Sequence, residues 1–214
     1  GGADARREIY VAHPGWDNMV PAIGGGRFVI SSVTKPKNRR FSNMNFAAAA
    51  KLAGYEEPTD FMCELLCDED GKVGIILLSM DPKDVDTIAR LPWSMIISDS
   101  LYGISDCPHP RLYGSFPKVL RDFVRERSVL TLPQAIHKMT AMPAARLGLN
   151  DRGVIEVGRK ADIAVFDPAV ITDHATYDDP KQLCTGLHAT LINGKVAIEK
   201  DSLCRRDCGV TIRK

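Results

Sequence analysis

Apolar residues along the chain form two kinds of pattern, one typical of strands and the other typical of helices. A β-branched run at 27–33 (RFVISSV) and near-continuous apolar runs at 73–79 (VGIILLS) and 94–98 (SMIIS) predict short strands. Alanine-rich or amphipathic stretches predict helices over residues 45–53, 59–66, 81–91, 116–127 and 131–139. Because strands and helices alternate as far as about residue 150, the pattern favours an α/β fold with a parallel sheet.

Local end signals support two of the helix boundaries. Asp81 stands before Pro82, which places an N-cap residue ahead of a proline at the first helical position. Thr131 and Gln134 have the spacing of a capping box, in which each residue satisfies a backbone N–H near the other. Both signals predict that a helix begins where the hydrophobic pattern places one.

The pattern changes after residue 148, where strand-forming runs replace the alternation. Short β-branched runs predict strands at 154–158 (VIEVG) and 162–166 (DIAVF). Residues 188–193 (HATLIN) and 195–199 (KVAIE) flank an Asn-Gly pair, which is typical of a tight β-hairpin turn. A β-rich module therefore follows the β/α part.

Composition excludes several classes of protein. Lys and Arg number 28 and Asp and Glu 27, and this balance argues against a general nucleic-acid binder. No apolar run approaches the ~18 residues that suggest a membrane span. The first residues (GGAD) have neither the basic nor the apolar region of a signal peptide, so we expect a cytoplasmic location. They also lack an initiator Met, which is typical of a processed or cloned fragment.

The six cysteines are dilute, and without an export signal we expect free thiols rather than disulfides. Cys63 and Cys67 are four residues apart, and so are Cys204 and Cys208. Either pair could supply half of a zinc site, but neither has the two-residue spacing of a zinc knuckle. We therefore do not expect a structural zinc.

Asp99 is the leading candidate for chemistry. It ends the predicted strand at 94–98 and precedes a predicted loop over 100–115, where α/β enzymes place functional side chains. A carboxylate there can bind a metal or accept a proton from metal-bound water, although an Asx-turn or a helix cap explains it equally well. Arg111 could clamp a substrate carboxylate or make a surface ion pair. His109, between two prolines, could line a pocket or be structural.

No metal-binding or phosphate-binding motif is complete within the chain. A catalytic hydrolytic zinc commonly needs about three protein ligands, and neither His-x-His nor HExxH occurs. The glycines at 24–26 precede a strand rather than a helix, which is the wrong order for a phosphate-binding loop. The chain by itself is therefore not predicted to hold a complete hydrolytic metal site.

Several segments, taken together, resemble a known enzyme family. Upstream, 97–100 (ISDS), 109–117 (HPRLYGSFP) and the segment 81–93 look like those of the N-acyl-D-amino-acid deacylases, the D-aminoacylase branch of the amidohydrolase superfamily. The C-terminal signature of that superfamily is similar to 142–149 (MPAARLGL), 152–155 (RGVI), 158–167 (GRKADIAVFD) and 191–196 (LINGKV). The resemblance covers residues 27–201 and is specific through the combination of motifs.

The resemblance implies the C-terminal part of a metal-dependent (β/α)8 hydrolase barrel, usually a zinc enzyme, followed by part of a small β-sandwich. Asp99 would be both a metal ligand and a catalytic residue that takes a proton from the metal-bound water and returns it to the leaving amine. Arg111 would hold the carboxylate of an N-acyl-D-amino acid. His109, Ser32 and Thr34 would also contact the substrate, the last two by a looser match.

The implied domains are 1–92, a barrel segment with an inserted α/β subdomain; 93–150, the last barrel strand and closing helices; and 151–214, the sandwich portion. The family's other metal ligands have no counterpart here. An upstream segment or a partner chain would supply the rest of the barrel, and the chain alone is expected to be inactive. The complete protein would hydrolyse N-acyl-D-amino acids to a carboxylate and a free D-amino acid.

Two alternatives remain open. A cyclic-amide hydrolase of the dihydropyrimidinase or dihydroorotase kind is the first, and 109–114 (HPRLYG) argues against it. A catalytically silent module for assembly or ligand binding is the second, and the missing ligands favour it. A partial barrel also has open strand edges, so we expect a homo-oligomer or aggregation unless the rest of the barrel is present.

Overall fold

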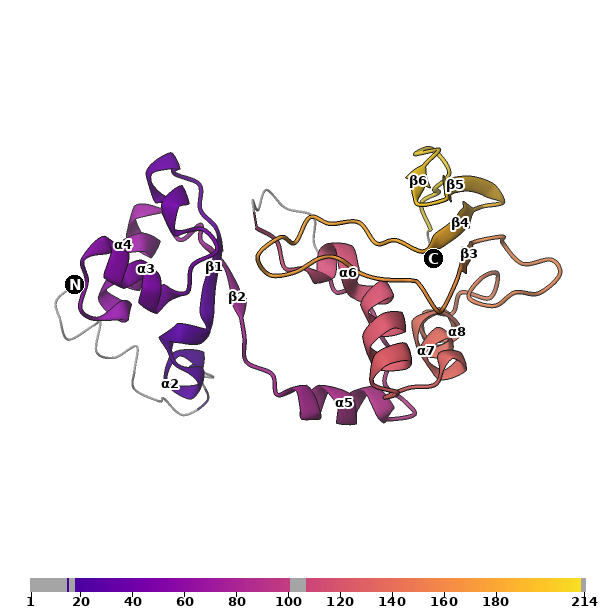
Figure 1. The fold of residues 1–214 in the computed structure, drawn as a ribbon, viewed down its shortest axis with the longest axis horizontal. Coiled ribbons are helices and arrows are strands. Elements are labelled where there is room, and N and C mark those ends of the chain that lie inside the picture. The colour runs from indigo at the N-terminus through magenta and orange to yellow at the C-terminus, as the bar shows by residue number, and fades with distance from the viewer. Residues whose placement is uncertain (1–14, 16–17, 101–106, 213–214) are drawn as a thin grey trace. The chain divides into compact units, whose positions relative to one another are not determined.

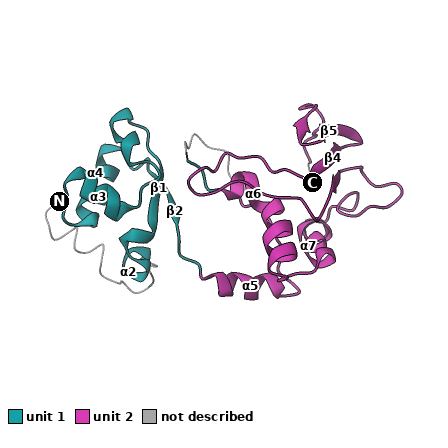
Figure 2. Cartoon of the chain, in the orientation of Figure 1, with its two compact units in different colours: residues 1–80, 102–109 teal, residues 81–101, 110–214 magenta. Residues whose placement is uncertain are grey.

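The computed structural model describes residue 15, residues 18–100 and residues 107–212. The chain divides into two compact units (Figure 2). The first unit comprises Gly1–Met80 and Tyr102–His109, and the second comprises Asp81–Leu101 and Pro110–Lys214.

The first unit is a two-stranded sheet joined to short helices (Figure 1). Its elements are α2 (Met19–Ile23), η1 (Gly25–Arg27), β1 (Phe28–Ser32), η2 (Pro36–Phe41), α3 (Phe46–Ala53), α4 (Pro58–Asp68) and β2 (Gly74–Leu77). β1 and β2 pair antiparallel, with Phe28 opposite Leu77 and Ile30 opposite Ile75. The predicted parallel pairing is therefore wrong for these strands, because the hydrophobic pattern fixes each strand but not the direction in which the chain returns to it.

The core of this unit is aromatic and packs helices against one face of β1. Phe28 and Ile30 point into it from the strand, and Phe61 meets Phe41 edge to face with ring centroids 4.9 Å apart. Ala49 is fully buried, which lets α3 lie close to its neighbours. The buried members are Phe28, Ile30, Phe41, Phe46, Ala49, Ala50, Phe61 and Leu65.

The second unit begins with helices. They are α5 (Pro82–Arg90), α6 (Arg111–Lys118), the π-helical segment η3 (Val119–Glu126), α7 (Leu132–Met139) and α8 (Ala141–Arg146). The predicted helix starts are confirmed at two places: Asp81 accepts the Lys83 N–H ahead of α5, and Thr131 and Gln134 form the capping box of α7.

The helix predicted at 116–127 begins five residues earlier than expected, at Arg111. The prediction treated the prolines as loop signals. Pro110 instead serves as the N-cap residue, where a missing N–H costs nothing, and Pro117 lies just before the wider π-type turns of η3. The helix therefore brings Arg111 to its first position.

Residues 94–98 do not form the predicted strand. Within the described part of the chain no strand pairs with them; the Ile96 N–H instead donates to the carbonyl of Lys138 at 3.1 Å. Apolar side chains on this segment and just before it stay exposed, Ile97 by 64% and Trp93 by 71%. Apolar composition favours a strand, but a strand also needs a neighbouring backbone with which to pair.

The C-terminal part is a four-stranded antiparallel sheet in the order β3-β4-β5-β6. Its strands are β3 (Ile163–Phe166), β4 (Leu187–Ile192), β5 (Lys195–Glu199) and β6 (Ser202–Leu203). The predicted hairpin is confirmed, because Asn193 and Gly194 have φ of 50° and 75° between β4 and β5. The strand predicted at 154–158 is absent, and Ile155 and Val157 are almost fully exposed, since nothing among the described residues pairs with them.

Among the residues that the structure describes, no helix is both long enough and apolar enough to cross a membrane. All six cysteines are free thiols, with Cys107 and Cys208 buried.

Candidate functional site

The structure brings together two of the residues singled out by sequence, Asp99 and Arg111. Nη2 of Arg111 lies 3.2 Å from Oδ2 of Asp99. Asp99 follows the 94–98 segment, and Arg111 opens α6. Both belong to the second unit, so the ion pair is a feature of one compact body.

This pair is accessible to solvent. The side chain of Asp99 is 74% exposed and that of Arg111 is 47% exposed. Exposed ion pairs contribute ~0–1 kcal/mol to stability, so this pair adds little to the fold. A guanidinium beside an exposed carboxylate can exchange that carboxylate for another, and the Asp99 oxygens can accept protons or ligate a cation.

The backbone around Asp99 is held in an unusual conformation. Asp99 has a φ of 45°, in the left-handed region that non-glycine residues seldom adopt. The next residue, Ser100, donates its hydroxyl to the carbonyls of Ser98 at 3.0 Å and Arg111 at 3.1 Å. Ser100 thus ties the turn at Asp99 to the start of α6 and brings the two charged groups together.

Ser32 and Thr34 lie in the first unit, at and just beyond the end of β1. With Val33, Gly71, Lys72, Val73 and Gly74 they line an open hollow of about 320 Å³. The donors of Thr34 point to a buried carboxylate: its N–H donates to Oε2 of Glu69 at 2.7 Å, and its hydroxyl donates to the same oxygen. The contact with substrate stays a prediction for both residues.

Glu69 is a buried charge that the sequence did not reveal. Its side chain is fully buried and accepts hydrogen bonds from Thr34, from the Lys35 N–H and from the Asn38 amide. Burial alone raises the pKa of this carboxyl, but the hydrogen bonds from Thr34 and Asn38 outweigh it and lower the pKa to about 2. Glu69 is therefore ionised and holds the loop after β1 against the end of α4.

His109 is half-buried and immediately precedes Pro110, the N-cap residue of α6. It belongs to the first unit, as Ser32 and Thr34 do, whereas Asp99 and Arg111 belong to the second. The substrate role of His109 also stays a prediction.

The described residues contain no cluster of three or more His, Cys, Asp or Glu side chains that could hold a metal ion. Asp99 fits a metal site as a single ligand, because its carboxylate is exposed and a carboxylate is a normal zinc ligand. One carboxylate cannot complete a zinc site, so the remaining ligands would come from elsewhere.

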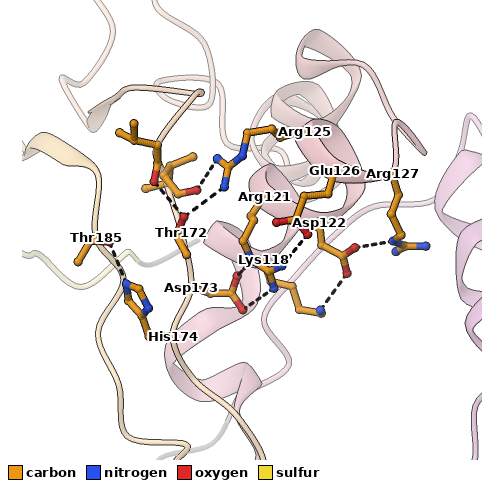
Figure 3. A network of polar contacts seen from close by, with 12 residues as sticks. Lys118, Arg121, Asp122, Arg125, Glu126, Arg127, Thr172, Asp173, His174 and Thr185 are labelled. Carbon is orange, nitrogen blue, oxygen red and sulfur yellow. Dashed lines mark hydrogen bonds and ion pairs between the residues drawn. The ribbon is translucent and has the colours of Figure 1, made fainter.

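A separate polar network links η3 to the loop that follows β3 (Figure 3). Nε of Arg121 donates to Asp173 at 2.6 Å, and this hydrogen bond to the carboxylate raises the pKa of the guanidinium. Arg125 donates to the carbonyl of Ile171 at 2.7 Å and to the Thr172 hydroxyl at 3.2 Å. These contacts join helix and loop, and they leave Asp99 and Arg111 out.

Sequence reasoning also missed Lys138, which is only 5% exposed on α7. A signal was present, since Lys138 lies three residues after Ala135, a fully buried residue on the apolar face of that helix. A lysine on the apolar face of a helix indicates a buried hydrogen-bonded cation.

Named deacylases are similar to this chain over part of their length. The chain is 42% identical to the N-acyl-D-aspartate deacylase of Alcaligenes xylosoxydans xylosoxydans over 153 residues. The matched stretch covers 66% of this chain and 30% of that protein. The chain is 45% identical over 121 residues to the N-acyl-D-glutamate deacylase of the same organism, 56% of this chain and 25% of that protein. A dihydroorotase of Lactobacillus acidophilus matches at 31% identity over 99 residues, 40% of this chain and 23% of that protein.

Solved structures agree with these relatives. A D-aminoacylase crystal structure superposes with a TM-score of 0.76 at 34% identity, covering 86% of this chain and 37% of that one. The N-acyl-D-glutamate deacylase of Bordetella bronchiseptica was solved in complex with zinc and a phosphonate mimic of the tetrahedral intermediate. It superposes with a TM-score of 0.73 at 35% identity, covering 80% of this chain and 34% of that one. The α/β fold is therefore similar to that of the D-aminoacylases. The model of the Amidohydrolase family matches residues 46–198, and the chain belongs to that family.

Proposed function

We propose that this chain is the C-terminal part of a metal-dependent hydrolase that cleaves the amide bond of N-acyl-D-amino acids. The observation that carries the proposal is the 3.2 Å pair of Asp99 and Arg111, in a chain whose relatives are deacylases of N-acyl-D-aspartate and N-acyl-D-glutamate. Every N-acyl-D-amino acid has an amide to hydrolyse and an α-carboxylate to hold, which matches a carboxylate beside a guanidinium.

The chain spans 30% of the first relative, so the proposal includes the remainder of the protein. We propose that residues 1–92 and 93–150 complete a (β/α)8 barrel whose other strands lie upstream or on a partner chain, and that 151–214 form part of a β-sandwich. The exposed apolar side chains Trp93 and Ile97 support this, because the remaining elements of a barrel would pack over them. Zinc is the proposed metal.

The roles of the chain's own residues follow from their chemistry. A bound zinc would lower the pKa of a water, so that after losing a proton near neutral pH it could attack the acyl carbon. Asp99 would accept the proton of that water on a carboxylate oxygen and would deliver it to the amide nitrogen as the C–N bond breaks. Arg111 exchanges its contact with Asp99 for the substrate carboxylate, which orients the amide and leaves the Asp99 oxygens open.

Cyclic-amide hydrolysis is the second candidate, since a dihydroorotase also matches the chain. Its lower identity and shorter match make it the weaker reading. Dihydroorotate also carries a carboxylate, so the ion pair alone does not separate the two reactions.

The test is amine release by the protein expressed from its complete reading frame and loaded with zinc. N-acetyl-D-aspartate, N-acetyl-D-glutamate and N-acetyl-D-leucine are compared with their L enantiomers. Loss of dihydroorotate is followed separately, because opening its ring releases no free amine. We expect hydrolysis of D substrates only. Asp99→Asn should lower kcat by about 10²–10⁴-fold, because the general acid–base group is lost. Arg111→Gln should chiefly raise KM.

Two results would overturn the proposal. Turnover of dihydroorotate with no release of D-amino acids would assign the chain to the cyclic-amide hydrolases. Full activity in Asp99→Asn would remove Asp99 from the reaction.

A further inference from the structure

Lys138 is a buried cation whose position is not explained by the proposed reaction. Its side chain is 5% exposed, and its ammonium donates to the carbonyl of Leu91, to the carbonyl of Ser94 at 2.9 Å and to the Ser94 hydroxyl at 3.0 Å. These three acceptors carry no formal charge. Burying a cation on such partners is expensive, and an apolar side chain in its place would often be as stable.

The acceptors lie in the stretch of chain that leads to Asp99. Leu91 is the C-cap residue of α5, where carbonyl groups lack helical partners and a cation is favoured by the helix dipole. Ser94 opens the 94–98 segment, and its hydroxyl also bonds to the Leu91 carbonyl at 3.0 Å. The Lys138 ammonium therefore fixes the turn from which this segment starts.

The main chain of Lys138 makes a second contact with the 94–98 segment. The carbonyl of Lys138 accepts the Ile96 N–H at 3.1 Å. Side chain and backbone of one residue thus fix Ser94 and Ile96, two positions on one face of the segment. The side chains of Trp93, Met95, Ile97 and Asp99 are the more exposed ones, so they alternate with the held positions.

The consequence falls on Asp99. Ser94 and Ile96, the two positions that Lys138 holds, lie five and three residues before Asp99, and in an alternating segment a slip of one residue turns each side chain to the opposite face. Asp99 can lie 3.2 Å from Arg111 only if the 94–98 segment keeps its position along the chain, without such a slip. From these contacts we infer that Lys138 is a positioning residue for Asp99, acting through Ser94 and Ile96. This inference rests on the proposed function.

The test uses the complete, zinc-loaded protein with an N-acetyl-D-amino acid substrate. Lys138→Met is compared with Lys118→Met, which removes an exposed lysine paired with Asp122 on the helix surface. kcat and KM are expressed per folded, zinc-containing molecule, and Tm is measured for each variant. We expect Lys138→Met to lower kcat by about 10- to 100-fold, the effect of misplacing a reacting group by ~1 Å, with KM within about two-fold. Lys118→Met should leave kcat unchanged.

Two further variants keep the test decisive. Lys138→Arg retains a cation with several donors and should recover part of kcat. If Lys138 only filled space, the Arg and Met variants would have similar kcat values. If Lys138→Met does not fold, Ser94→Ala decides, since it removes the hydroxyl contact and should lower kcat by about three- to ten-fold at unchanged KM.

The opposite outcomes are distinct. A Lys138→Met protein with a lower Tm but a normal kcat per folded molecule would make Lys138 a helix cap only, and would overturn the inference. If Lys138→Met does not fold, an unchanged kcat in Ser94→Ala would overturn the inference instead. Asp99→Asn is measured in parallel. If Asp99→Asn is inactive and Lys138→Met has a normal kcat, the role of Lys138 is refuted and the proposed function stands. If Asp99→Asn is active, the proposed function itself fails.

Discussion

Two carboxylates, one in each compact unit, are held in opposite ways. Glu69 is fully buried, and Thr34, Lys35 and Asn38 donate hydrogen bonds to it. Asp99 is 74% exposed, lies on a backbone with a φ of 45° and has a solvent-accessible arginine as its ion-pair partner.

The difference separates a carboxylate that builds the fold from one that is available for chemistry. The lone pairs of Glu69 are used by donors of its own unit, so it has little capacity for a ligand. Asp99 has open oxygens, and its arginine can be displaced at little cost because exposed pairs are weak. A low pKa and deep burial therefore mark the structural group here, and exposure with backbone strain marks the candidate site.

The comparison is tested most strongly by truncating each carboxylate. Glu69→Ala should destabilise the chain by about 3 kcal/mol, since it leaves several buried donors without an acceptor. Asp99→Ala should change the free energy of unfolding by less than about 1 kcal/mol. Urea unfolding of both variants measures the difference. Equal losses would mean that Asp99 is as structural as Glu69.

Acid should weaken the first unit through the same carboxylate. The pKa of Glu69 is about 2 in the folded chain against an ordinary value of 4.5. The folded state therefore favours the ionised form, so this stabilisation is complete above about pH 5 and is lost as the pH falls from 4.5 towards 2. Asp68, whose pKa the Lys37 and Asn38 side chains lower to about 2, acts in the same direction.

Thermal unfolding between pH 7 and pH 2 measures this effect, with Glu69→Gln as the matched control. The variant should be less stable at pH 7 and should lose less stability on acidification. An identical pH dependence in both proteins would assign the acid sensitivity to other groups.

The smallest effects should come from the ion pairs of the second unit. Arg121→Gln should cost about 1–2 kcal/mol, because it leaves the carboxylate of Asp173, only 6% exposed, without its guanidinium. Lys118→Gln should cost less than about 0.5 kcal/mol, since it breaks a surface i,i+4 pair. Arg111→Gln should resemble Lys118→Gln in urea unfolding. A loss as large as that of Arg121→Gln would show that Arg111 also supports the fold.

Local chemistry explains what could be predicted. The starts of α5 and α7 and the turn between β4 and β5 were correct because each depends on a few adjacent residues, such as Asp81 with Pro82 or Asn193 with Gly194. Asp99 and Arg111 could be named as candidates because their residue types and their places beside predicted elements were visible in one dimension.

The strand predictions that failed needed a partner distant in sequence. A strand at 94–98 or 154–158 requires a neighbouring backbone, and the described residues provide none. The early start of α6 depended on how two prolines are used in context. In each case the local pattern was compatible with more than one structure.

The sequence by itself determined where most helices and strands lie, because hydrophobic period, caps and turn residues act over a few positions. Only the tertiary structure decided that β1 and β2 run antiparallel, that Thr34 donates to Glu69 and that Lys138 holds the segment leading to Asp99. The physical reason is that pairing direction, buried hydrogen bonds and ion pairs join residues tens of positions apart. Their free energy depends on which groups the fold removes from water together, and composition and spacing do not record this.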